Sequence, residues 1–151
     1  MTAKDLVVFL KDHKMPIPPQ LEDRPVRIVV VDDEPAITEM IARAILAKHP
    51  EYEVHQAHDG FRAGSMVATL RPDAVILDLR MPGMDGFEVC RMIKAQDNTR
   101  QATVIAVTAY QSEESDRRIR ECGAKTCLAK PLDLAELVGE VDAAVQVSKE
   151  S

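Results

Sequence analysis

The sequence predicts an α/β fold in which helices cover both faces of one parallel sheet. Short apolar runs alternate five times with longer stretches whose apolar residues recur at helical spacing, a pattern typical of βα units. Parallel strands require such helical crossovers. The chain has 151 residues, of which 46% are hydrophobic, and this length and composition suit a single compact domain.

The N-terminal residues precede this alternation. Residues 2–14 predict one short helix, with Leu6, Phe9 and Leu10 on a shared face. Residues 15–19 carry three prolines within four positions and predict an extended linker. We therefore expect residues 1–24 to form a helix and linker, and residues 25–148 the compact domain. An exposed apolar stripe often marks a contact, so a homodimer formed through this helix is one expectation.

The first half of the compact domain predicts two strands and two helices. Val26–Val31 is an uninterrupted apolar run, which indicates a buried strand. Pro35 suits the first turn of the following helix, because a residue there needs no N–H donor. Apolar residues then recur every fourth position, at Ile37, Ile41 and Ile45. Tyr52–Ala57 predicts a weaker second strand, and a helix from Asp59-Gly60 to about Leu70 follows it.

The next two strands are also short apolar runs. Ala74–Leu77 predicts the third strand, since turn-forming residues bound it on both sides. A helix containing Phe87 and Ile93 follows, with Phe87 facing inward. Thr103–Val107 then predicts the fourth strand.

The last part of the chain predicts a further helix, a short strand and a final helix. Ser112 is a suitable N-cap, with acidic residues in the first turn that follows it, and Gly123 marks the end of that helix. Lys125–Leu128 predicts the fifth strand. The final helix has one apolar side, made of Leu134, Leu137, Val138, Val141 and Val145.

Polar residues stand within two positions after four of the predicted strands. They are Asp32, Asp33, Asp78, Thr108 and Lys130. Taken singly, each has a simpler explanation as a helix cap or a solvated turn. Because parallel strands end at one edge of the sheet, where the binding sites of such folds lie, the five together predict one functional site.

Carboxylates at the ends of two buried strands repel one another unless a cation neutralises them. Mg²⁺ prefers hard oxygen ligands and retains several waters. Asp33 and Asp78 can each supply one oxygen, Asp32 can hold a metal-bound water, and a backbone carbonyl just past Asp78 can complete the set. The second oxygen of Asp78 can then attack phosphorus and form an aspartyl phosphate.

The remaining residues of the predicted site suit a phosphoryl group. Thr108 offers a hydroxyl and Lys130 an ammonium to the phosphoryl oxygens. Ala109 is small, which leaves room for a phosphoryl donor to approach. We therefore expect Asp78, Thr108 and Lys130 to perform the chemistry, with Mg²⁺ as the cofactor.

These motifs resemble the receiver domains of bacterial two-component response regulators. The resemblance covers residues 24–148 and rests on four segments: Val29–Pro35, Asp78–Gly86, Thr108-Ala109 and Lys130-Pro131. It implies a flavodoxin-like, doubly wound five-stranded sheet of strand order 2-1-3-4-5. It also implies a cis Lys130–Pro131 peptide bond.

The resemblance implies a function as well. Asp78 would accept a phosphoryl group from the phosphohistidine of a histidine kinase, in two-component (phosphorelay) signal transduction. Mg²⁺ would bind to Asp33, Asp78 and the backbone carbonyl of Arg80, assisted by Asp32. The chain would then be a signalling domain rather than an enzyme, and it would switch its binding to a downstream protein that the sequence does not identify.

The sequence departs from the receiver pattern at one position. Receivers carry Tyr or Phe in the fifth strand, three residues before the lysine, and here that residue is Cys127. Cys127 is too small to report phosphorylation by burial of a ring, so Tyr110 is a candidate to take over part of this role. Arg80 and Tyr110 lie two residues after Asp78 and Thr108 and predict slow hydrolysis of the phosphoryl group.

Two other functions fit part of the pattern. A phosphorylation-independent interaction module would explain Cys127, but the intact acidic cluster favours phosphorylation. A haloacid-dehalogenase-like phosphatase also uses an aspartate nucleophile. It needs a second aspartate two residues later, where this chain has Arg80.

Composition excludes several further classes. The net charge of −6 argues against nucleic-acid binding by this chain alone, because phosphate contacts require clustered Lys and Arg. Cys90, Cys122 and Cys127 show no paired spacing, which suits a reducing compartment. The early apolar run is too short to span a membrane, so we expect a cytoplasmic protein that does not bind membranes.

Overall fold

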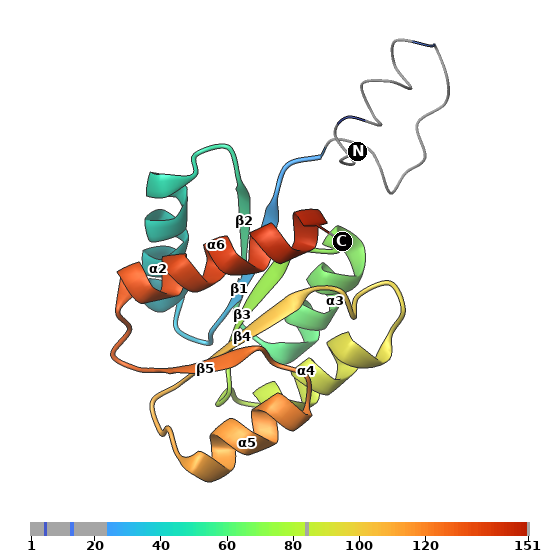
Figure 1. Ribbon diagram of the computed structural model, residues 1–151. Helices are drawn as coiled ribbons and strands as arrows, with labels where there is room; N and C mark the ends of the chain where they lie inside the picture. Colours follow the sequence, from blue (N-terminus) through green and yellow to red (C-terminus); the bar gives the residue numbers. More distant parts are fainter. Residues whose placement is uncertain (1–4, 6–12, 14–23, 84, 151) are drawn as a thin grey trace.

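The computed structural model describes residues 5, 13, 24–83 and 85–150. The N-terminal helix and the proline-rich linker predicted above fall almost entirely outside this part of the chain. Figure 1 shows one sheet with helices on both sides. The strands are parallel and lie in the order β2-β1-β3-β4-β5, which confirms the predicted topology.

Five strands and five helices alternate along the described chain. The strands are β1 (Arg27–Val31), β2 (Glu53–Ala57), β3 (Ala74–Asp78), β4 (Thr103–Thr108) and β5 (Thr126–Ala129). The helices are α2 (Pro35–Lys48), α3 (Gly60–Leu70), α4 (Gly86–Ala95), α5 (Glu113–Glu121) and α6 (Leu134–Glu150). The predicted bounds agree within one or two residues. Two of the differences matter for the site, because Asp78 and Thr108 are the last residues of their strands and do not follow them.

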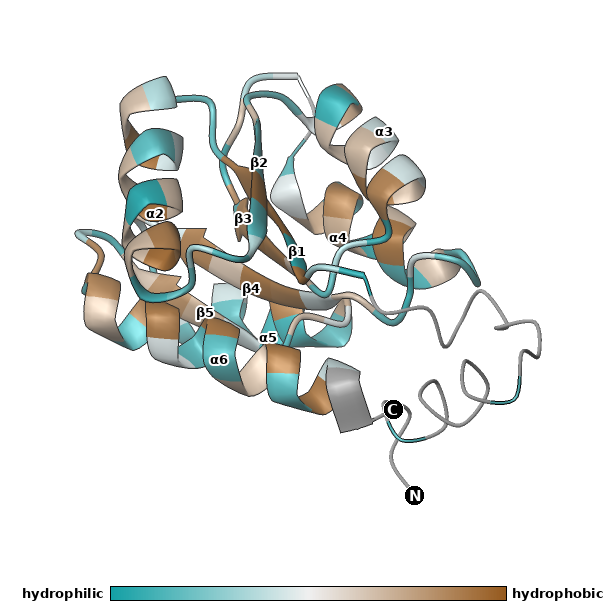
Figure 2. Cartoon of the chain, turned by 90° about the horizontal axis from the view of Figure 1, so that it is seen from above, coloured by the Kyte–Doolittle hydropathy of each residue, from teal (hydrophilic) through white to brown (hydrophobic). Residues whose placement is uncertain are grey.

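The core consists of two apolar layers, one on each face of the sheet. Side chains alternate along a strand, so Val29 and Val31 of β1 pack toward α3, α4 and α5. Ile28 and Val30 point the other way, toward α2 and α6. Figure 2 shows these hydrophobic strands between helices that carry both hydrophilic and hydrophobic residues. The sheet is therefore buried on both sides, as the continuous apolar runs predict.

Local sequence explains where several helices begin and end. Asp59 and Asp85 cap α3 and α4, each accepting a hydrogen bond from the backbone N–H three residues later. Ser112 caps α5 in a reciprocal arrangement with Ser115. Gly123 follows α5 with a φ of +109°, a left-handed conformation that glycine adopts readily.

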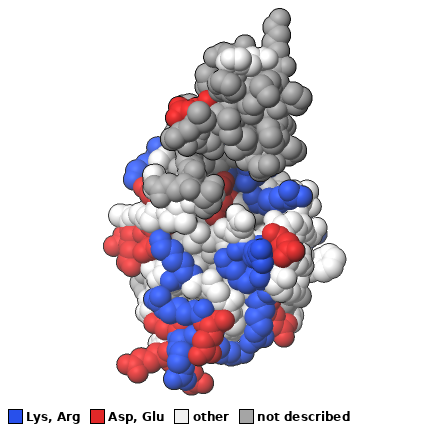
Figure 3. All heavy atoms as spheres, turned by 45° about the vertical axis from the view of Figure 1, so that its right-hand side comes forward, with Lys and Arg blue, Asp and Glu red and all other residues white. Residues whose placement is uncertain are grey.

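The outer surface mixes charges of both signs. On the face drawn in Figure 3, Lys and Arg side chains alternate with Asp and Glu, so this face offers no continuous basic surface. Within the described residues, none of the helices combines the length and the apolar character that crossing a bilayer requires.

Candidate functional site

The carboxyl edge of the sheet brings the predicted site residues together. Asp32 directly follows β1, Asp78 and Thr108 end β3 and β4, and Lys130 directly follows β5. Backbone pairing holds these strand ends level: Leu79 N–H donates to Val107 O at 3.0 Å, and Lys130 N–H donates to Thr108 O at 2.8 Å. The parallel register therefore places residues that are up to 98 positions apart beside one another.

Three carboxylates form the centre of this site. One oxygen from each of Asp32, Asp33 and Asp78 lies within 4.8 Å of the others. Asp32 is 2% exposed and Asp78 is 6% exposed, whereas Asp33 faces the solvent. The arrangement therefore opens to water on the side of Asp33.

Lys130 is the cation that the structure places among these carboxylates. Its Nζ donates to Asp32 Oδ2 at 2.7 Å and lies 3.5 Å from Asp78 Oδ2. Burial acts to lower the pKa of Lys130, but Asp32 and Asp78 outweigh it and the pKa is raised. Lys130 thus stays charged and holds the two buried carboxylates together.

The pKa of Asp78 is raised by burial, and the nearby charge of Asp32 adds to this effect. A hydrogen bond from Arg80 N–H to Asp78 Oδ1 (3.2 Å) and the charge of Lys130 act in the opposite direction. The single ammonium of Lys130 therefore does not fully offset the cost of burying the charge of Asp78. A further positive charge beside Asp78 would stabilise its ionised form.

The acidic cluster has the chemistry of a hard-cation site. Its donors are all carboxylate oxygens, the ligands that Mg²⁺ prefers, and the exposed side leaves room for retained waters. Asp32 is also fixed from its own loop, because Glu34 N–H donates to Asp32 Oδ1 at 2.9 Å. The residues present therefore fit a magnesium ion.

Thr108 lies at the end of β4 with its side chain buried. It is 2% exposed, and its Oγ1 accepts a hydrogen bond from Tyr110 N–H at 3.1 Å. Ala109, between them, is exposed. The hydroxyl of Thr108 thus connects the strand end to the loop that leads into α5.

Arg80 and Tyr110 form a pair beside the site. The guanidinium of Arg80 lies 4.4 Å from the centre of the Tyr110 ring, within the range of a cation–π interaction. Tyr110 is 65% exposed. The sequence places each of the two residues next to the site but does not predict that they stack.

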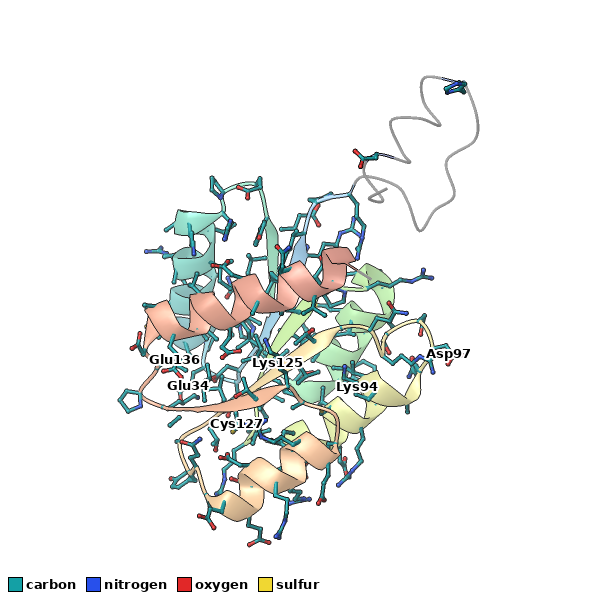
Figure 4. The ribbon with its side chains drawn as sticks, viewed as in Figure 1. Glu34, Lys94, Asp97, Lys125, Cys127 and Glu136 are labelled. Atoms are coloured by element: carbon teal, nitrogen blue, oxygen red, sulfur yellow. The ribbon has the colours of Figure 1, made fainter. Side chains whose placement is uncertain are left out.

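Cys127 lies on β5 and faces α5 (Figure 4). Cys127 is 6% exposed. Its burial, and to a smaller extent the nearby carboxylate of Asp116, raise the pKa of its thiol to about 12. Gln111 contacts the same residue, because its Nε2 donates a hydrogen bond to Cys127 O at 3.2 Å. Gln111 and Asp116 belong to no recognisable motif, so the sequence alone does not identify them as part of this site.

The Lys130–Pro131 peptide bond, directly after the site lysine, is cis, as the resemblance to receivers implies.

Gly86 also shapes the site. A Cβ atom on Gly86 would lie 2.6 Å from both Asp78 O and Leu79 Cα, so only a glycine lets the start of α4 approach the end of β3 so closely.

Comparisons with known proteins agree with this geometry. The family model of the response regulator receiver domain matches residues 28–142. The chain is 37% identical over 124 residues to the response regulator MprA of Mycobacterium tuberculosis, covering 82% of this chain and 52% of that protein. It is 33% identical over 117 residues to the DNA-binding dual master transcriptional regulator RpaA of Synechocystis, covering 78% of this chain and 48% of that protein.

A solved structure gives the same result. The signal receiver domain of a DNA-binding response regulator from Colwellia psychrerythraea superposes with a TM-score of 0.76 at 33% identity, covering 80% of this chain and 98% of that one. The chain spans about half the length of the curated relatives that it matches. Its fold, its site and these matches together show that the chain belongs to the family of response regulator receiver domains.

Proposed function

We propose that this receiver domain accepts a phosphoryl group on Asp78 from the phosphohistidine of a histidine kinase. The observation that carries the proposal is the placement of Asp78. Its buried carboxylate lies beside a second buried carboxylate and a lysine that contacts both. A nucleophilic carboxylate requires nearby positive charge before it can attack an anionic phosphoryl group.

The transfer exchanges one bond to phosphorus for another. An oxygen of Asp78 attacks phosphorus, the bond from phosphorus to the kinase imidazole nitrogen breaks, and that nitrogen retains the electron pair. Mg²⁺, held by Asp33, Asp78 and the Arg80 carbonyl with help from Asp32, would supply positive charge that screens the two anions from each other. Ala109 leaves space for the donor beside Thr108.

Lys130 and Thr108 stabilise the product. The ammonium of Lys130 is already 3.5 Å from Asp78 Oδ2, so a small movement away from Asp32 brings it to a phosphoryl oxygen. The Thr108 hydroxyl can donate to a second phosphoryl oxygen. Both are donors of the kind that stabilise phosphoryl groups in proteins.

The test is incubation with acetyl phosphate and Mg²⁺, followed by intact mass measurement. We expect the wild type to gain one phosphoryl group, and we expect chelation of Mg²⁺ to prevent this. Asp78→Asn should show no gain. Asp97→Asn is a matched control, because the side chain of Asp97 is 94% exposed and lies in the turn after α4. Equal labelling of Asp78→Asn and the wild type would place the acceptor elsewhere.

The wider role is part of the same proposal. The protein would act in the cytoplasm, a histidine kinase would be the donor, and phosphorylation would change the binding of a downstream protein. Residues 1–24 would form a separate helix and linker that pairs two copies, and residues 25–148 the receiver. The domain would assist only its own phosphorylation and dephosphorylation. The net charge of −6 favours a protein partner over a nucleic acid.

One observation favours a second candidate, a module that binds its partner without phosphorylation. Cys127 stands where receivers carry the aromatic ring that reports phosphorylation. Partner affinity that is equal for the wild type, phosphorylated or not, and for Asp78→Asn would support this second function.

A further inference from the structure

We infer that Gln111 couples the phosphorylation site to α5, as a latch that holds the loop after β4 against both α5 and β5. The inference rests on the proposed phosphorylation of Asp78 and concerns its consequence. Cys127 has no ring through which to act, and the side chain of Gln111 contacts both the backbone of Cys127 and a carboxylate of α5. Gln111 lies three residues after Thr108, within the connecting loop.

The side-chain amide of Gln111 joins three elements. Its Nε2 donates to Cys127 O on β5 at 3.2 Å and to Asp116 Oδ2 on α5 at 3.4 Å. Gln111 itself belongs to the loop between β4 and α5. One group thus holds together the loop, the first turns of α5 and the edge strand of the sheet.

Asp116 makes this latch sensitive to small movements. Its Oδ1 is buried and has no hydrogen-bond partner among the described residues. Gln111 provides a hydrogen bond at the other oxygen, Oδ2, which lies on the solvent side. The adjacent Cys127 thiol keeps its proton, since burial and Asp116 raise its pKa. Withdrawal of Gln111 would remove the protein contact at Oδ2 while Oδ1 stays buried without a partner, which favours a movement of α5 that brings this carboxylate into water.

Thr108 connects the latch to the site. Its Oγ1 accepts a hydrogen bond from Tyr110 N–H at 3.1 Å, and Tyr110 is the neighbour of Gln111 in the chain. When the Thr108 hydroxyl turns to donate to a phosphoryl group on Asp78, its oxygen can still accept from Tyr110 N–H. The loop then follows Thr108 toward the site, and Gln111 leaves Asp116 and Cys127. Phosphorylation thereby biases an element with two arrangements.

The experiment measures backbone amide hydrogen exchange in residues 116–123, with and without Mg²⁺ and beryllofluoride, an analogue of the phosphoryl group. We expect beryllofluoride to speed exchange in the wild type about five- to tenfold, since loss of one or two hydrogen bonds has an effect of this size. Gln111→Ala should exchange at the faster rate without beryllofluoride and respond little to it. Gln111→Glu, which places a carboxylate beside Asp116, should behave in the same way.

Gln101→Ala is the matched control, because Gln101 is exposed in the turn before β4. It should respond as the wild type does, and all variants should still gain a phosphoryl group in the mass assay. A full beryllofluoride response in Gln111→Ala would overturn the latch. So would a wild type that is phosphorylated on Asp78 but shows no change in α5. Absence of phosphorylation at Asp78 would instead overturn the proposed function, and the latch with it.

Discussion

Lys130 lies closer to Asp32 than to Asp78, by 2.7 Å against 3.5 Å. This asymmetry has a simple electrostatic reason. Two buried carboxylates share one ammonium, and the closer contact goes to Asp32, which is the more deeply buried of the two. Asp78 therefore has the weaker contact with Lys130, and its oxygen Oδ2 is more available for a new bond. This suits the residue that takes part in the chemistry.

The pair formed by Arg80 and Tyr110 predicts a long-lived phosphoryl group. Removal of the ring in Tyr110→Ala, or of the guanidinium in Arg80→Ala, should open a path for water to Asp78. We expect the phosphoryl group to be lost about tenfold faster, which corresponds to about 1.4 kcal/mol of activation free energy. The decay of the labelled species by intact mass, after removal of the donor, measures this rate.

The double variant tests whether the two side chains act as one unit. If they do, Arg80→Ala combined with Tyr110→Ala should hydrolyse no faster than either single variant. Arg91→Ala, which removes an exposed arginine of α4, serves as the control. An unchanged lifetime in both single variants would show that the pair does not shield the site.

At the scale of elements, the site depends on how closely α4 approaches β3. Gly86 opens α4, and the space above it is filled by the backbone of Asp78 and Leu79. A backbone cannot rotate away as a flexible side chain does, so an added methyl group would displace the strand end or the helix. The position of Asp78 is thus set partly by the lack of a side chain eight residues later.

The space around each glycine predicts opposite effects on stability for two substitutions by alanine. Gly86→Ala should lower the free energy of unfolding by about 2–3 kcal/mol and slow the labelling of Asp78. Gly139→Ala, in α6, has open space around its new methyl group and should raise the free energy of unfolding by about 0.5–1 kcal/mol. Urea unfolding of both variants gives these values, and a Gly86→Ala protein as stable as the wild type would disprove the close packing.

At the scale of the whole molecule, one polar network joins the first and last described helices. Asp142 on α6 accepts hydrogen bonds from Lys48, at the end of α2, and from His49 Nε2 at 2.7 Å. The ring of His49 stacks on Tyr52 with centroids 4.3 Å apart. These contacts span more than ninety positions of sequence and fix α2 beside α6 on one face of the sheet.

The network predicts a stability difference that depends on pH. Burial acts to raise the pKa of Asp142, but the bonds from Lys48 and His49 outweigh it, so the pKa lies below its ordinary value of 3.8. A lowered carboxylate pKa stabilises the fold above that value, and the effect is lost as the pH falls through the folded pKa. Asp142→Asn should therefore cost about 1 kcal/mol at neutral pH and almost nothing in strong acid.

Denaturant unfolding near neutral pH and at about pH 2–3 measures this difference. Asp97→Asn is again a suitable control, because its exposed carboxylate should give nearly the same stability as the wild type at both pH values. An Asp142→Asn variant that is destabilised equally in acid and at neutral pH would show that shape, and not charge, is what Asp142 contributes.

Much of this architecture could be predicted because it is encoded locally. Val26–Val31 and Ala74–Leu77 are apolar without interruption, and such runs become buried parallel strands in nearly any context. Ser112 and Gly123 mark the two ends of α5 through their own backbone preferences. The strand order and the cis bond before Pro131 came from the resemblance to receivers, and the structure confirms both.

The chain's own sequence thus determined the alternation of elements and the identity of the residues at the carboxyl edge of the sheet. The tertiary structure alone decided how those residues pair. It showed that Lys130 lies nearer to Asp32, that Arg80 stacks on Tyr110, and that Gln111 reaches both Asp116 and Cys127. The physical reason is range: a strand or a helix cap depends on neighbours a few positions away. These contacts, by contrast, join side chains of separate elements whose distances exist only after the sheet and its helices have packed.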